Sequence, residues 1–181
     1  LGKEGFIDVV RAYKAKRPSG QKEHKRKVDI VSKAISPMKF SFVPVGRMFY
    51  QLAPHLQRTT LNIPLLRSTD DSRVVVEAYP ALIARPFGPY KHDHPKKQTT
   101  KHLEARQAIV QKILDDTHVK VELSSEQQEA LVDDPKADVL DAFLCAIQGA
   151  WAYLHRDTNY GIPDYADVLE GWIVDPTLKI D

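Results

Sequence analysis

The segment from Asp138 to Leu154 constrains the fold more than any other part of the sequence. Between Lys136 and His155 its only charged residues are Asp138 and Asp141, and apart from Gln148 the other positions are apolar or small. A helix that is hydrophobic on nearly every side has to be buried. We therefore predict a long helix from Asp138 to about Leu154, packed against a sheet as in layered α/β domains.

Two shorter segments predict strands. Residues 73–79 contain three consecutive valines followed by Glu77, Ala78 and Tyr79, and Pro80 ends the run. A continuous β-branched run of this kind is typical of a strand that is buried on both faces. Residues 119–123 alternate between apolar and charged side chains, which is the period of a strand with one buried face.

Apolar residues at three- and four-residue spacing predict four further helices. They cover residues 3–16, residues 45–56, the stretch from Thr99 or Thr100 to about Asp116, and the stretch from Ser124 or Ser125 to Leu131. Pro54 falls inside the second of these and should kink or end it. Residues 86–98 are rich in Pro, His and Lys and predict a loop. The whole order predicts a single α/β domain over residues 1–181, with a basic helical segment at about 1–35 and a loop-rich tail at about 156–181.

Composition excludes several classes of protein. The chain has 43% hydrophobic and 28% charged residues, and no apolar run approaches the ~18 residues of a membrane span. Nothing at the N-terminus resembles a secretion signal, and one cysteine, Cys145, excludes an internal disulfide framework. We expect a cytoplasmic protein that does not contact membranes.

Charge is distributed unevenly along the chain. Residues 1–50 carry twelve Lys or Arg against four Asp or Glu, whereas residues 101–181 carry seven against sixteen. This asymmetry is compatible with a phosphate-facing surface beside a metal-collecting one. Two ordinary solvated surfaces explain it equally well.

Three acids are candidates for metal ligands. Glu77 finishes a strand-like run, and ligands collect beyond the carboxyl ends of strands in open α/β sheets. Asp138 and Asp141 share one face of a helix. A solvated strand end and a helix N-cap are the simpler interpretations of these acids. Gathered together, however, three carboxylates would need a cation, and oxygen ligands suit Mg²⁺ or Mn²⁺.

Other reactive residue types form no recognisable site. His92, His94 and His102 lack the cysteine partners and the spacing of a zinc site. Cys145 lies among apolar neighbours and is interpreted as a core residue. Two basic groups remain as candidates for contact with phosphate, although a charge run is usually a solvated face. They are Lys22, Lys25, Arg26 and Lys27 near the N-terminus, and Lys91, Lys96, Lys97 and Lys101 after Glu77.

Several short motifs in order resemble the domain of unknown function 429 family. They are Val76-Glu77-Ala78-Tyr79-Pro80, Asp138-Val139-Leu140-Asp141-Ala142 and Glu170-Gly171-Trp172-Ile173. Ser36-Pro37-Met38-Lys39 and Val43-Pro44-Val45-Gly46-Arg47-Met48 are similar to a bacterial subgroup of it. The resemblance extends from about residue 15 to 176.

The resemblance implies a predicted nuclease of the ribonuclease H-like fold, an α/β mixed sheet flanked by helices. It implies an aspartate on the first strand, a glutamate ending a later strand, and aspartates opening the C-terminal helix. Glu77 matches the second role, and Asp138 and Asp141 match the third. The first role has no match, since neither Asp8 nor Asp29 lies in an apolar strand. The N-terminal β-meander of the family is therefore expected to be absent.

The leading functional hypothesis is a Mg²⁺-dependent (or Mn²⁺-dependent) nuclease acting on DNA or RNA, in which two ions would align water and the leaving oxygen. Glu77, Asp138 and Asp141 would hold metal, and the basic side chains of Lys91, Lys97 and Arg106 would position phosphate. The alternative is a non-catalytic nucleic-acid-binding or interaction protein. A third hypothesis is a fragment that needs its missing strands and has no independent function.

Overall fold

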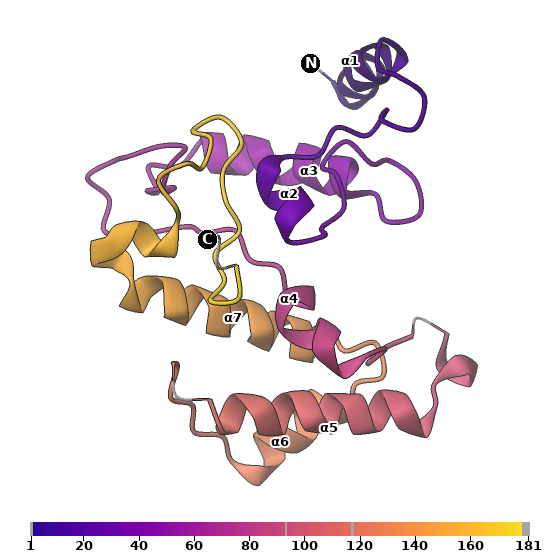
Figure 1. The fold of residues 1–181 in the computed structure, drawn as a ribbon, viewed down its shortest axis with the longest axis vertical. Helices are drawn as coiled ribbons and strands as arrows, with labels where there is room; N and C mark the ends of the chain where they lie inside the picture. The colour runs from indigo at the N-terminus through magenta and orange to yellow at the C-terminus, as the bar shows by residue number, and fades with distance from the viewer. Residues whose placement is uncertain (1, 93, 117, 179–181) are drawn as a thin grey trace. The chain divides into compact units, whose positions relative to one another are not determined.

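The fold was analysed in a computed structural model that describes residues 2–92, 94–116 and 118–178 (Figure 1). The chain divides into two compact units. Unit 1 comprises Leu1–Val75 and Asp164–Trp172, and unit 2 comprises Val76–Pro163 and Ile173–Asp181.

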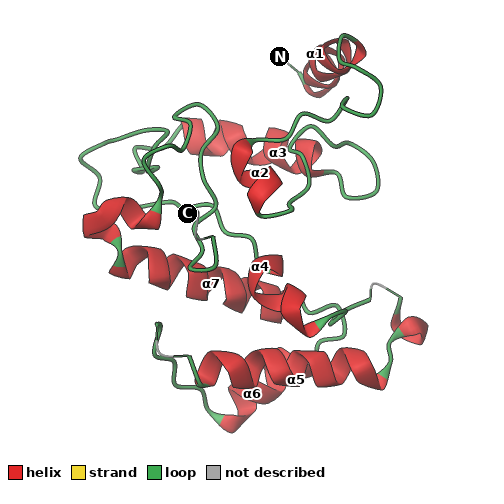
Figure 2. Ribbon diagram, in the orientation of Figure 1, coloured by secondary structure: helices red, strands yellow, loops and turns green. Residues whose placement is uncertain are grey.

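Among the described residues the regular secondary structure is helical, with isolated β-bridges but no strand or sheet (Figure 2). The predicted α/β ribonuclease H-like mixed sheet is therefore wrong. The valine run is extended, but its bridges go to different partners: Val74 pairs with Asn62, and Glu77 pairs with Ile173. One bridge to each partner makes no continuous ladder, so the run packs as a single extended segment.

The second predicted strand, residues 119–123, is likewise extended without a partner strand. Its apolar members Val121 and Leu123 pack against the helical core of unit 2, while Lys120 and Glu122 are exposed. The prediction of a strand is therefore wrong, although the alternation of residue types does correspond to one buried and one solvated side. The buried side faces helices and not a second sheet layer.

The described residues of unit 1 form three helices, and the two longer ones confirm the predicted segments. They are α1 (Lys3–Ala15), α2 (Lys27–Val31) and α3 (Val45–Gln57). Pro54 lies inside α3 but does not end it, because the helix runs on to Gln57. The end of α3 has its own donor: the Arg67 guanidinium bonds the carbonyl oxygen of Leu56 at 3.1 Å.

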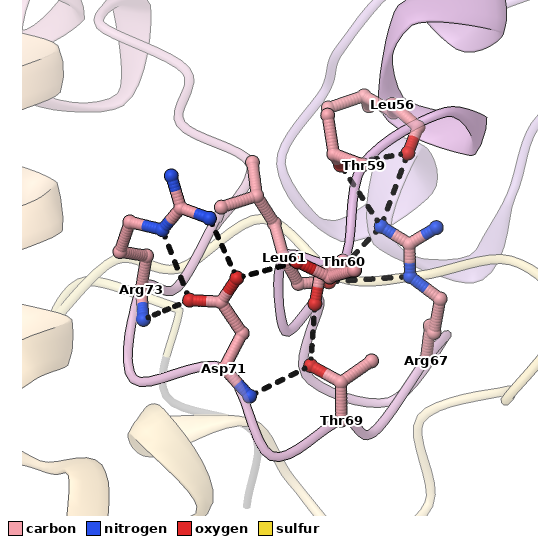
Figure 3. Close-up of polar contacts among 8 residues, drawn as sticks. All are labelled: Leu56, Thr59, Thr60, Leu61, Arg67, Thr69, Asp71 and Arg73. Atoms are coloured by element: carbon pink, nitrogen blue, oxygen red, sulfur yellow. Dashed lines mark hydrogen bonds and ion pairs between the residues drawn. The ribbon is translucent and has the colours of Figure 1, made fainter.

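The segment after α3 is held by a polar network (Figure 3). Arg67 also donates to the Leu61 carbonyl oxygen at 3.0 and 3.2 Å. The Asp71 carboxylate accepts from the Arg73 side chain at 2.7 and 3.0 Å and from the Thr60 hydroxyl at 2.7 Å. These hydrogen bonds, those from Arg73 first, hold the pKa of Asp71 well below its ordinary value.

Arg26 forms an ion pair with the buried Asp29, and bonds from Arg26 and Lys27 reach a distant part of unit 1. Asp29 is fully buried, and its carboxylate accepts from the Arg26 guanidinium at 2.8 Å and from the Arg26 main-chain N–H at 2.8 Å. Arg26 also donates to the Glu170 carbonyl oxygen at 3.1 Å, and the Lys27 N–H donates to the Glu170 carboxylate at 2.9 Å. Trp172, two residues further on, is buried. Arg26 therefore has a structural role and is not part of a solvated basic face.

The described residues of unit 2 form four α-helices and three short 3-10 turns. The helices are α4 (Ala81–Ala84), α5 (Thr100–Leu114), α6 (Ser125–Asp133) and α7 (Asp138–Leu154), and the turns are η1 (Arg85–Phe87), η2 (Pro95–Lys97) and η3 (Arg156–Gly161). The predicted extents of α5, α6 and α7 are confirmed to within a few residues. The predicted partner of α7 was wrong, because α7 shares its core with α5 and α6 through Leu140, Leu144, Ile109, Ile113 and Leu131.

No helix of the described residues is long and apolar enough to cross a membrane. The longest of the described helices is α7, which belongs to unit 2.

Candidate functional site

Asp141 is the best-defined of the predicted site residues. It lies one turn into α7, and one carboxylate oxygen accepts from the Tyr90 hydroxyl at 2.7 Å. The other oxygen forms an ion pair with the Lys91 ammonium. Burial, followed by the bond to Asp141, raises the pKa of Tyr90 well above its ordinary value. Both oxygens of Asp141 therefore have donors from this chain.

The loop that carries Tyr90 and Lys91 is held in place by Arg106. This side chain is buried, and its guanidinium donates to the Tyr90 carbonyl oxygen at 2.9 Å and to the Val132 carbonyl oxygen at 2.5 Å. Burial lowers the pKa of Arg106. These contacts give the side chain a structural role: it fixes Tyr90 relative to α5 and α6, although the sequence analysis assigned it to phosphate binding.

The start of α7 differs from the predicted helix cap. Asp138 is the first helical residue and is exposed, so its carboxylate is not the cap. Asp134 takes that role, accepting from the main-chain N–H groups of Asp138 at 2.6 Å and Val139 at 3.2 Å. Burial acts to raise the pKa of Asp134, but the N–H groups outweigh it and lower the value. The N-cap residue itself is Ala137, with a φ of 57°.

Glu77 lies on the extended segment that pairs with residue 173. Its side chain is exposed, and its carbonyl oxygen accepts from the Val174 N–H at 2.9 Å. Two residues on, the buried side chain of Gln148 accepts from the Tyr79 N–H at 2.8 Å and donates to the Tyr79 carbonyl oxygen at 3.1 Å. The same amide donates to Asp175. Gln148 thus joins α7 to both extended segments, a role that the sequence analysis missed.

The residues do not fit a metal centre. Among the residues that the structure describes, no three His, Cys, Asp or Glu side chains are gathered in a way that could hold a metal ion. Glu77, Asp138 and Asp141 are all described and therefore do not form one. Asp141 already has a lysine as its counter-ion, so its charge needs no metal to balance it.

The histidines of the loop before α5 and of its first turn accept hydrogen bonds from main-chain N–H groups. The ring nitrogen Nδ1 of His102 accepts from the Thr99 N–H at 3.0 Å, and Nδ1 of His92 accepts from the His94 N–H at 3.0 Å. They support the entry into α5.

A cluster of exposed lysines remains, which we call the η2 lysine patch: Lys96 and Lys97 on η2 and Lys101 in the first turn of α5. The loop beneath it is attached at both ends. Lys91 pairs with Asp141 on α7, and the Gln98 amide donates to the Pro135 carbonyl oxygen and, at 2.7 Å, to the His92 carbonyl oxygen. The lysines are therefore displayed on a supported loop at the N-terminus of a 15-residue helix.

The fold and this region together define a two-unit helical protein with a conspicuous carboxylate–lysine pair and an adjacent basic patch. A family model described as "Protein of unknown function (DUF429)" matches residues 45–167, which is more than half of the chain. The chain belongs to this family, as the motifs implied. No curated protein and no solved structure matches it.

Proposed function

We propose that the protein binds the phosphate backbone of nucleic acid and does not cleave the nucleic acid in a metal-dependent reaction. The observation that carries the proposal is the η2 lysine patch, Lys96, Lys97 and Lys101, on a loop supported from both ends. Lysine contacts to phosphate supply the sequence-independent part of nucleic-acid affinity. The non-catalytic alternative is favoured over the nuclease because the three candidate acids do not gather into a metal-binding group.

The position of the patch adds to its charge. The first N–H groups of α5 and its macrodipole favour an anion at the same end of the helix that carries Lys101. Under this proposal Lys97 contacts phosphate, as predicted from the sequence. Lys91 contributes indirectly, because its ammonium is paired with Asp141 and fixes the loop.

The test is the salt dependence of binding to a short DNA duplex and to a single-stranded RNA of the same length. Each phosphate contact contributes about 0.7–0.9 to the slope of log K against log salt. The double variant Lys96→Gln/Lys97→Gln should bind more weakly and lose roughly 1.4–1.8 units of slope. The matched control is Lys112→Gln/Lys120→Gln, which removes two lysines of unit 2 outside the patch and should bind like the parent.

Equal losses in the two double variants would refute a specific role of the patch. Incubation of labelled DNA and RNA with Mg²⁺ or Mn²⁺ tests the nuclease hypothesis separately. No divalent-dependent cleavage is expected. Cleavage that disappears in Glu77→Gln and Asp141→Asn would overturn the proposal in favour of the nuclease.

A further inference from the structure

Unit 1 contains a long stretch without any acidic residue. Between Asp29 and Asp70 the sequence has no Asp or Glu. The basic residues of the same stretch are Lys33, Lys39, Arg47, Arg58 and Arg67. Of these, Arg67 is used internally at the end of α3. This stretch therefore contributes only positive or neutral side chains to the surface of unit 1, which favours an anionic partner.

The helix α3, in the middle of this stretch, has one packed side and one exposed side. On the packed side, a Cβ at Gly46 would lie 2.6 Å from the Phe40 ring, and Tyr50 packs on Phe6 of α1 with ring centroids 5.3 Å apart. On the other side lie large apolar residues that are mostly exposed: Met48 at 63%, Phe49 at 54% and Leu52 at 56%. Their three- and four-residue spacing puts them on one face of the helix.

The loop before α3 also carries exposed apolar residues. Phe42 is 98% exposed and Val43 is 47% exposed. Phe42 has a φ of 61°, a left-handed conformation that is unfavourable for a bulky side chain. The conformation is held because the Gly46 N–H donates to the Lys39 carbonyl oxygen at 2.9 Å and so closes the loop behind Phe42. A fully solvated phenylalanine in such a loop buries no apolar area and so does not stabilise the fold. This points to a role in contact with a partner.

Contrary to the expectation from composition, we propose that the α3 apolar face, defined as Phe42, Val43, Met48, Phe49 and Leu52, attaches unit 1 to the surface of an anionic lipid bilayer. The face would enter the boundary between headgroups and acyl chains, and α3 would lie in the plane of the membrane. Lys39 precedes the face in the acid-free stretch, and Arg47 lies on the opposite, polar side of α3 from Phe49 and Leu52. Cations on the polar side of such a helix add attraction to anionic lipid.

The chemistry of the face favours lipid over two other partners. Single-stranded nucleic acid binds by stacking bases on aromatic rings, whereas Met48 and Leu52 have no ring to offer. A symmetric contact with a second copy would place the same surface patch on both sides. It would therefore bring the basic residues of two acid-free stretches together, and like charges at close range repel.

The experiment is sedimentation of the full chain with vesicles of phosphatidylcholine alone and of phosphatidylcholine mixed with phosphatidylserine. Binding is expected only to the mixed vesicles and should weaken as salt is raised. The variant Phe49→Gln/Leu52→Gln should lower the partition coefficient at least tenfold, and Arg47→Gln should lower it severalfold. The matched control is Leu169→Gln, an 87% exposed leucine of unit 1 outside the acid-free stretch, which should bind like the parent.

Because the substituted side chains are exposed, the variants should keep the parent melting curve, and circular dichroism checks this. Failure of the parent chain to sediment with anionic vesicles, or equal binding by the face variant and the parent, would overturn the proposal. A loss of self-association in Phe49→Gln/Leu52→Gln, measured by analytical ultracentrifugation without vesicles, would assign the face to a second copy instead. A loss of RNA binding with vesicle binding intact would assign it to base stacking and would also overturn the proposal.

Discussion

Replacing Gln148 by leucine tests the central polar contact of unit 2. The side chain is fully buried, and its amide bonds both main-chain groups of Tyr79 and the carboxylate of Asp175. Leucine fills most of the same volume. It leaves the Tyr79 N–H, the Tyr79 carbonyl oxygen and the Asp175 carboxylate without the Gln148 amide as a hydrogen-bond partner. Each buried polar group that loses its bond costs about 1–3 kcal/mol. Because Tyr79 is only partly buried and Asp175 keeps the Thr177 N–H at 2.7 Å, we expect a total of about 2–4 kcal/mol.

The assay is urea unfolding followed by the fluorescence of Trp151, measured in a Trp172→Phe background. The remaining tryptophan then reports unit 2, to which Trp151 belongs. The matched control is Gln111→Leu on α5, whose exposed amide bonds only Asp115 at 3.0 Å and which should change stability by less than about 0.5 kcal/mol. If Gln148→Leu falls within about 0.5 kcal/mol of its parent, the amide does not hold the extended segments, and the reasoning fails.

Three further predictions concern single positions. Asp134→Ala removes the carboxylate that caps α7 and should cost about 1 kcal/mol in urea unfolding. Gly161→Ala should cost about 2–4 kcal/mol, because its Cβ would lie 2.2 Å from the Trp151 ring at a φ of +72°, whereas Gly149→Ala meets no atom within 4 Å and should be neutral or stabilising. Asp71 has a lowered pKa, so its stabilisation is complete above about pH 4 and is lost as the pH falls; the stability difference between Asp71→Asn and the parent should shrink in acid melts.

The helices of this protein could be predicted from the sequence because their pattern is local. The apolar run of α7 and the spacing of α5 appear within a few turns of chain, so their bounds were correct to within a few residues. The strands could not be predicted in the same way. A run such as residues 73–79 shows that a segment is extended, but a strand also needs a partner along its whole length. Here the partners are single residues, Asn62 and Ile173.

The candidate site shows the same division. Asp141 and Lys91 were each selected from the sequence, but as a metal ligand and a phosphate contact, and their ion pair became evident only in the structure. Lys91 and Asp141 are fifty residues apart, so no local spacing relates them. Gln148 was noticed as the one neutral polar residue in an apolar helix, which is the signal that could have identified its role. Its partners, Tyr79 and Asp175, could not be inferred.

By itself, the sequence determined the approximate extents of the five longer helices, α1, α3, α5, α6 and α7, and the family to which the chain belongs. It could do so because helix periodicity and short motifs are properties of neighbouring residues. Only the tertiary structure decided that α7 packs on helices instead of a sheet, that Asp134 caps it, and that Asp141 is balanced by Lys91. These outcomes depend on which residues, distant in sequence, come into contact. Each polar group that such a contact buries then needs a hydrogen-bond partner.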